Sequence, residues 1–262
     1  MLIDVHAHVT IDPGGQLARA AVAGVERTVL LSTRVHPEGA ETPAQVRAEF
    51  ARLGAVISGA ANARDEYEIA MQELRRALDA HPDSTVGFVN VALDQPVAEL
   101  QASLSRGLAE PQIVGIGELT PAPGAAGRIE PVLQVSADHG GLPVLTHGFA
   151  PNTGDDLTVY AELAARYPSV ALIVGAFGGL NCLQLIDLAR DRNNLYLDLS
   201  SALQVFAVRA AANELPEQCL FGSNTPYGDV LASRTTIEAA ITDPSIRARV
   251  LHDNAEQLIA RR

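Results

Sequence analysis

Two histidines near the start of the chain are spaced so that they can act together. Residues 1–8 have the sequence Met-Leu-Ile-Asp-Val-His-Ala-His, which ends in His6 and His8. The apolar, β-branched run that begins at Leu2 predicts a strand, and alternate side chains of a strand lie on the same face. Imidazole is the commonest protein ligand for zinc-like ions. The pair therefore indicates a metal site, because the alternative of two polar residues at a fraying end fits poorly with an apolar strand.

Composition and net charge limit the classes of molecule that such a site could bind. The 262 residues are 47% hydrophobic but only 4% aromatic, with no Trp, so a core must be built from Ala, Val, Leu and Ile. The formal net charge of −12 argues against binding of nucleic-acid phosphates or of an anionic membrane surface. The expected partner is a small-molecule substrate, and neither nucleic acid nor a membrane.

The cysteines and the hydropathy pattern bear on the compartment. Cys182 and Cys219 are too few for a disulfide framework and would remain thiols in the cytosol. The chain shows no basic segment followed by an apolar one, as in a secretory signal. No apolar run reaches the ~18 residues that a membrane span needs. These features predict a soluble, cytoplasmic protein.

Short apolar strands alternate with helical segments along the whole chain. The strands are predicted at residues 2–8, 27–33, 85–93, 113–119, 142–146, 170–174, 195–199 and 219–222. Eight such β/α alternations favour an α/β fold of the (β/α)8 type, the TIM barrel. An open doubly wound sheet is the alternative. It is disfavoured because Pro13-Gly14-Gly15 after the first strand does not match the G-x-G-x-x-G phosphate turn.

The domain organisation is predicted to be simple. The chain has no linker or repeat that would divide it, so we expect one domain over residues 1–262. Residues 34–82 form a longer excursion than one crossover of a barrel requires. We therefore expect this segment to form a partial lid over the C-terminal mouth of the barrel, where such barrels keep their active sites.

The predicted C-terminal ends of the strands hold a set of polar residues, and these ends face the active site in a barrel. The residues at these ends are His6, His8, Asn90, Glu118, His147, Gly175-Ala176, Asp198 and Asn224. Three histidines and a glutamate that converge on one mouth are suited to hold Zn²⁺ or another divalent ion such as Mn²⁺. For Glu118, an acid that is hydrogen-bonded at the mouth without a metal is an equal alternative.

Five segments match a known pattern in order and spacing. They are Ile-Asp-Val-His-Ala-His at 3–8, Ala-Asp-His-Gly-Gly-Leu-Pro-Val-Leu-Thr-His at 137–147, Leu-Tyr-Leu-Asp-Leu-Ser at 195–200, Leu-Phe-Gly-Ser-Asn-Thr-Pro at 220–226 and Asp-Asn-Ala-Glu-Gln-Leu at 253–258. Together they resemble the amidohydrolase superfamily, in the branch called amidohydrolase 2 or amidohydrolase-related. The resemblance implies a distorted barrel of the metal-dependent-hydrolase type, with His6, His8 and His147 as metal ligands.

Two positions depart from this family's pattern. Ala176 lies where the sixth strand usually ends in a His, and Asn224 lies where the eighth strand usually ends in a metal-bound Asp. In many members that Asp also takes a proton from the attacking water. An amide such as Asn224 ligates a metal only weakly and is no base near neutral pH. Glu118 or Asp198 is then the candidate proton acceptor and Glu118 a candidate fourth ligand, although Asp198 can equally orient a His.

We therefore predict a metal-dependent hydrolase that acts on a small ester, lactone or amide through a metal-activated water. A nonoxidative decarboxylase is the enzymatic alternative, weakened by Ala176 because those enzymes resemble one another in having a His there. A barrel that has lost catalysis and binds a small molecule or a partner is the third alternative, favoured by Ala176 together with Asn224. Barrels of this kind often dimerise, so a homodimer is a candidate assembly.

Overall fold

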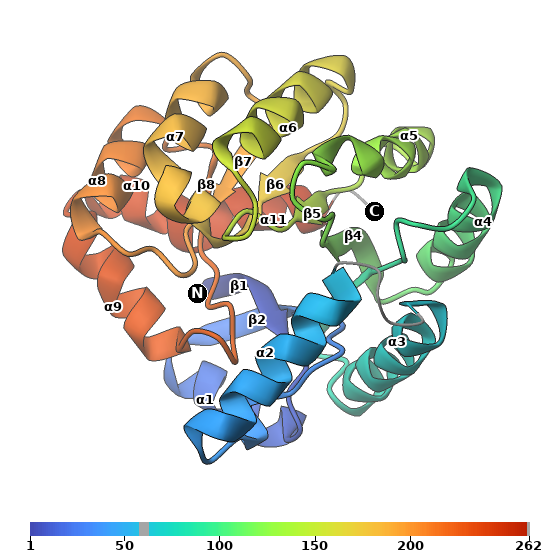
Figure 1. Ribbon diagram of the computed structural model, residues 1–262. Helices are drawn as coiled ribbons and strands as arrows, with labels where there is room; N and C mark the ends of the chain where they lie inside the picture. Colours follow the sequence, from blue (N-terminus) through green and yellow to red (C-terminus); the bar gives the residue numbers. More distant parts are fainter. Residues whose placement is uncertain (58–62, 261–262) are drawn as a thin grey trace.

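Eight parallel strands form the centre of the molecule. The computed structural model describes residues 1–57 and 63–260 (Figure 1). The strands pair in chain order from β1 to β8, each parallel to the next, so the predicted (β/α)8 barrel is confirmed. Their bounds are β1 Leu2–His8, β2 Val25–Leu31, β3 Thr85–Val89, β4 Ile113–Leu119, β5 Val144–Thr146, β6 Leu172–Val174, β7 Leu195–Asp198 and β8 Cys219–Leu220.

The barrel closes because β1 runs alongside the backbone that follows β8. Val5 N donates to Phe221 O (3.0 Å), and Asn224 N donates to His6 O (2.7 Å). Strand β8 itself has only two residues. The closure therefore depends on irregular backbone beyond β8, and that backbone carries Asn224 to the mouth.

Helices form a ring around the strands in Figure 1. Their bounds are α1 Pro13–Val22, α2 Pro43–Ile57, α3 Ala63–Ala80, α4 Val97–Leu108, α5 Glu130–Asp138, α6 Gly154–Arg166, α7 Cys182–Arg190, α8 Val205–Glu214, α9 Val230–Ala240, α10 Pro244–Ala248 and α11 Asn254–Ile259. Among the described residues, no helix combines the length and apolar character needed to cross a membrane.

Two apolar layers pack the barrel. The larger lies between the outer faces of the strands and the helices, and it includes Leu30 and Val144. The smaller fills the interior from alternate strand positions such as Val29 and Leu145. Leu258 of α11 belongs to this inner layer. Helix α11 thus covers one end of the barrel, and the parallel strands bring their polar C-terminal ends together at the other.

The side chains of β1 change direction within the strand. Val5 belongs to the inner apolar layer and Ala7 to the outer one. A register shift against β2 occurs between Asp4 and Ala7. This irregularity allows His6 and His8 to point together into the mouth, above the apolar interior.

Strand β3 is shorter than the predicted 85–93 because Asn90 takes the backbone out of the ladder. Its Oδ1 accepts a hydrogen bond from Val91 N (2.8 Å), and its Nδ2 donates to Glu118 O (2.8 Å). Such side-chain bonds to backbone groups compete with strand pairing. Asn90 thus supports the end of β4, where Glu118 lies.

The segment predicted as a lid divides into two parts. Helix α3 packs against β2 and β3 and so takes the place of their crossover helix. Helix α2 is additional, and its Phe50 and Leu53 line a cavity at the mouth. Figure 1 shows α2 lying across the front of the barrel on the side of β1 and β2. This position suits a partial lid, which stays a prediction.

The turn into β5 offers a test of the backbone packing. Gly140 and Gly141 both have positive φ (+88° and +77°), but only at Gly141 would a Cβ meet a backbone atom, Ser169 O at 2.1 Å. We expect Gly140→Ala to lower the free energy of unfolding by about 1 to 2 kcal/mol through the left-handed backbone alone. Gly141→Ala should lower it by at least about 1 kcal/mol more, because the carbonyl must shift. Urea titrations measure both, and equal losses would contradict this packing.

Candidate metal centre

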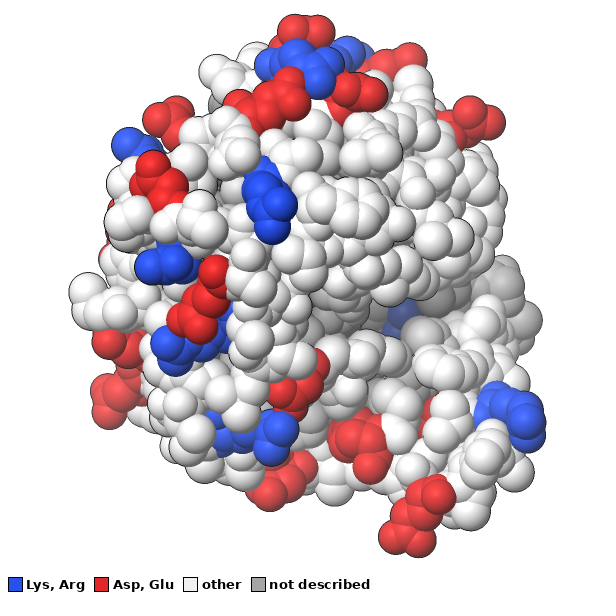
Figure 2. Space-filling model, turned by 90° about the vertical axis from the view of Figure 1, so that its left-hand side faces the viewer, with Lys and Arg blue, Asp and Glu red and all other residues white. Residues whose placement is uncertain are grey.

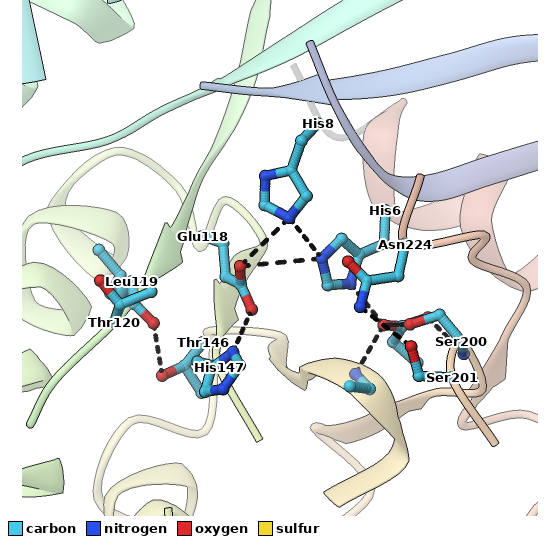
Figure 3. A network of polar contacts seen from close by, with 12 residues as sticks. His6, His8, Glu118, Leu119, Thr120, Thr146, His147, Ser200, Ser201 and Asn224 are labelled. Carbon is cyan, nitrogen blue, oxygen red and sulfur yellow. Dashed lines mark hydrogen bonds and ion pairs between the residues drawn. The ribbon is translucent and has the colours of Figure 1, made fainter. Parts of the chain in front are cut away.

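Three side chains from two strands meet at the mouth of the barrel. His6 Nε2 lies 3.3 Å from His8 Nε2, and Glu118 Oε2 lies 3.8 Å from the first nitrogen and 3.5 Å from the second (Figure 3). All three residues are buried, with exposed fractions of 1%, 7% and 6%. Their ligand atoms lie within 4.8 Å of one another, which is the arrangement that one metal ion requires.

Asp198 at the end of β7 lies behind His6. Its Oδ2 lies 2.6 Å from His6 Nδ1 and accepts hydrogen bonds from Ser200 Oγ (2.6 Å) and Ala176 N (3.0 Å), while Oδ1 accepts from Ser200 N (3.0 Å). A Cβ at Gly222 would lie 2.1 Å from Asp198 Oδ1, so glycine is required there. With Nδ1 held by a carboxylate, His6 turns the lone pair of Nε2 toward the cluster. This geometry favours an orienting role for Asp198 over that of a base.

His147 reaches the cluster through Glu118. Its Nδ1 lies 3.0 Å from Glu118 Oε1 and its Nε2 lies 3.4 Å from Ala150 O. Its side chain is 22% exposed, so it stands between the cluster and the open mouth. Burial by itself would lower the pKa of His147, but Glu118 outweighs this effect and raises it. In this arrangement His147 is a partner of the glutamate, and its ligand atoms lie outside the three-residue group.

Asn224 presents an oxygen that has no partner. Its φ of 53° is left-handed, and its Nδ2 donates to Ser201 Oγ (3.0 Å). Its Oδ1 is buried and accepts no hydrogen bond from any described residue. Figure 3 shows this oxygen on the side of the His6 ring. A buried acceptor left open is costly, and a cation bound by His6 and His8 would satisfy it.

The electrostatics of the cluster favour a positive charge. Burial by itself would lower the pKa of His6, but the Asp198 and Glu118 carboxylates raise it to about 9. Burial lowers the pKa of His8 to about 4. Burial would raise the pKa of Glu118, yet His147 and His6 lower it to about 2. The carboxylates beside His6 therefore favour a positive charge at the cluster, and a bound metal ion would supply one. Two imidazoles, a carboxylate and an amide oxygen fit Zn²⁺ or Mn²⁺.

The position where the family pattern has a sixth-strand His offers no side-chain ligand. Ala176 is buried, with φ of 50°, and its backbone N–H donates to Asp198 Oδ2 (3.0 Å). The residue therefore helps to hold the Asp198 carboxylate, and it adds no imidazole to the mouth.

A cavity of about 690 Å³ opens beside the cluster. Its polar lining includes His8, Glu118, His147 and Asn224. The apolar lining comes from Phe50 and Leu53 of α2 and from Phe149, Leu199 and Leu203. Figure 2, which views the side of α8 and α9, shows a hollow with a largely uncharged rim. The cavity has the size and mixed character of a small-molecule site.

Two residues of this site, Ser200 and Tyr227, were not predicted from the sequence. Ser200 holds Asp198, and it was part of the matched segment 195–200, where its spacing of two from Asp198 was the available signal. Tyr227 lines the cavity, and its ring packs edge-on against His8 with 5.6 Å between the centroids. It follows the matched segment 220–226 directly, in a chain with few aromatic residues.

Similar proteins identify the family. The family described as Amidohydrolase matches residues 3–261. The chain belongs to this family. The resemblance drawn from the five segments is therefore confirmed. No curated protein matches the chain.

Several solved structures have the same fold, and three of them are described below by their similarity to this chain. A dihydroxybenzoic acid decarboxylase from Polaromonas, with bound manganese and the inhibitor 2-nitroresorcinol, is 12% identical, with a TM-score of 0.70 over 99% of this chain and 96% of that chain. A 4-oxalomesaconate hydratase from Rhodopseudomonas palustris is 14% identical (TM-score 0.66, 100% and 96% covered). A Pseudomonas putida protein of proposed 2-pyrone-4,6-dicarboxylic acid hydrolase activity is 18% identical (TM-score 0.63, 99% and 97% covered).

The hydrogen bond behind His6 can be tested by replacing its carboxylate. We expect Asp198→Asn to weaken binding of Zn²⁺ and Mn²⁺ by about 10- to 100-fold, because the amide no longer fixes the His6 tautomer. Competition titrations with a chromophoric chelator measure the affinity. Asp187→Asn on α7, 67% exposed, is the matched control and should bind as the wild type does. Unchanged affinity in Asp198→Asn would exclude His6 as a ligand that Asp198 orients.

Proposed function

We propose that the chain is a metal-dependent hydrolase that acts on a small ester, lactone or amide in the cavity at the barrel mouth. The observation that carries the proposal is the convergence of His6 Nε2, His8 Nε2 and Glu118 Oε2. The open Oδ1 of Asn224 would add a fourth, weaker ligand. Zn²⁺ and Mn²⁺ are the candidate ions, and the Polaromonas decarboxylase of the same fold has bound manganese.

The chemistry divides between the ion and the chain. A bound divalent ion would polarise the substrate carbonyl and lower the pKa of a water molecule. Glu118 is the proposed proton acceptor, because its carboxylate lines the cavity beside the converging ligand atoms. Asp198 is fully buried and does not line the cavity, so we assign it the positioning of His6. His147, at 3.0 Å from Glu118 Oε1, would hold that carboxylate in place.

Helix α2 would act on access to the site. Phe50 and Leu53 form part of the cavity wall, and the Phe50 side chain is 51% exposed. An exposed aromatic ring at the edge of a cavity can cover bound substrate and exclude water. We therefore propose that residues 34–82 form a partial lid over the site, and that the whole chain folds as a single domain.

Two other functions fit the same family. A decarboxylase has the support of relatives such as the Polaromonas enzyme, but at 12% identity that likeness shows the fold alone. Ala176 weighs against a decarboxylase, because the imidazole expected of such enzymes is absent. Only the backbone N–H of Ala176 contributes at this position, and it donates to Asp198 Oδ2. A barrel that only binds a small molecule is favoured by the amide at Asn224. Metal content separates this last function from hydrolysis.

Metal content of the purified protein is the first test. We expect elemental mass spectrometry to find about one zinc, manganese or iron per chain in protein prepared without chelator. The variant His6→Ala/His8→Ala should lose it, because two of the three converging ligands are gone. The control His81→Ala/His139→Ala removes two histidines outside the cluster and should retain the metal. Absence of metal from the wild type, even after dialysis against zinc, would refute metal-assisted hydrolysis.

The proton acceptor has its own test. We expect Glu118→Gln to reduce turnover of any hydrolysed substrate, found by screening lactones, aryl esters and amides, by about 100-fold or more. Metal content measured on the same sample separates a lost ligand from a lost base. Glu256→Gln is the matched control, since Glu256 is 45% exposed and only approaches Arg27 at 3.8 Å. Undiminished turnover in Glu118→Gln would remove Glu118 as the acceptor.

A further inference from the structure

Arg34 lies next to the barrel mouth, away from the surface ion pairs. Arg34 follows the end of β2 and is half-buried. Its Nη2 donates to Thr120 Oγ1 (3.3 Å), just beyond β4. Its Cζ lies 4.1 Å from the centroid of the Tyr67 ring on α3, so the guanidinium is stacked on an aromatic face. Thr120 and Tyr67 together fix the position of the charge.

Glu66 on α3 and Glu118 act electrostatically on the guanidinium of Arg34, but neither forms an ion pair with it. Among the side chains that the structure describes, no carboxylate forms an ion pair with it, and Thr120 accepts its one hydrogen bond. Two arginines nearer the surface differ: Arg75 bonds Glu110 at 2.9 Å, and Arg166 bonds Glu130 at 2.6 Å. A guanidinium has five N–H donors, and leaving them unpaired away from water is costly. Burial also lowers the pKa of Arg34.

Arg34 adjoins the substrate cavity through Thr120. Its hydrogen-bond partner Thr120 lines the cavity together with Glu118 and His147. Besides Tyr67 and Glu66 on α3, the cavity residues Tyr227 and Glu118 interact electrostatically with the guanidinium. An anionic group in the cavity would therefore find one cationic partner beside the proposed metal centre.

We propose that Arg34 binds a carboxylate of the substrate, and that the substrate class is therefore a carboxylate-bearing ester, lactone or amide. The inference rests on the proposed function only in that the cavity is taken as the substrate site. A planar guanidinium matches a carboxylate with two parallel hydrogen bonds. Arg34 makes one side-chain hydrogen bond among the described residues, so further N–H donors remain for such a pair.

The surrounding charges make this arginine decisive for an anionic substrate. The protein carries a net charge of −12, and the cavity lining contributes Glu118 and Asp229. Asp229 is already paired with Arg19 at 2.6 Å. Without Arg34, a substrate carboxylate would enter a field of its own sign. The guanidinium therefore distinguishes charged from uncharged substrates of equal shape.

Calorimetric titration with matched pairs of probes tests the proposal. One pair is 5-oxotetrahydrofuran-2-carboxylate and its primary amide, and the other is monomethyl succinate and methyl succinamate. In each pair only the carboxylate is replaced by an uncharged group. We expect the carboxylate of at least one pair to bind about tenfold more tightly than the amide, both in protein as purified and after chelator treatment. Equal or undetectable binding of both members of both pairs would overturn the proposal.

Two substitutions locate the effect. We expect Arg34→Gln to bring the two affinities to within about twofold, and Arg34→Lys to retain part of the preference as a point charge without the fork. Arg106→Gln is the matched control and should keep the full preference, since this exposed arginine on α4 donates, among the described residues, only to Ser103 Oγ (3.0 Å). Circular dichroism confirms that each variant is folded. If Arg34→Gln does not fold, the comparison of each probe pair in the wild-type protein still tests whether the cavity prefers a carboxylate.

The outcomes separate this inference from the proposed function. A carboxylate preference that survives chelator treatment and is lost in Arg34→Gln supports Arg34 even if no hydrolysis is found. A preference that chelation abolishes and Arg34→Gln leaves intact means that the carboxylate ligates the metal, which overturns the role of Arg34. Hydrolysis of uncharged lactones with no carboxylate preference would likewise support the proposed function and refute the assignment of Arg34.

Discussion

The contact between His6 Nδ1 and Asp198 Oδ2, at 2.6 Å, links the first strand of the barrel to the seventh, and the site depends on it. Asp198 has no exposed surface, and its oxygens also accept hydrogen bonds from Ser200 and from Ala176 N. A carboxylate held by so many donors cannot turn toward the cavity. It determines which nitrogen of His6 faces the mouth, and so decides where His6, His8 and Glu118 converge.

At two positions, Ala176 and Asn224, this chain lacks the side chain typical of the family. These two differences change the charge of the site more than its shape. Asn224 keeps an oxygen near His6 but contributes no negative charge, and Ala176 replaces an imidazole with a backbone N–H directed at Asp198. Glu118 is then the one carboxylate at the converging ligand atoms. A divalent ion held by two neutral imidazoles, one carboxylate and one amide would retain net positive charge. That charge and Arg34 would both favour an anionic substrate.

This local preference runs against the charge of the whole protein. The net charge of −12 is spread over the surface, where many acidic groups are paired with arginines such as Arg166 and Arg234. In the mouth, burial weakens screening, so a single guanidinium can outweigh a distant surface field. Phe50 and Leu53 of α2 strengthen this effect, because apolar side chains at the rim reduce the access of water.

The sequence by itself determined the barrel and the set of polar strand ends, because alternation of apolar strands with helices and the spacing of His6 and His8 are local properties. The sequence could not decide which of these polar residues bind a metal, which position other residues and which contact substrate. Only the tertiary structure showed that Asp198 turns away from the cavity, that His147 contacts Glu118, and that Arg34 meets Thr120. These partners are separated by 192, 29 and 86 residues. They meet only when the sheet closes and a register shift in β1 directs the side chains, and neither event leaves a mark in local sequence pattern.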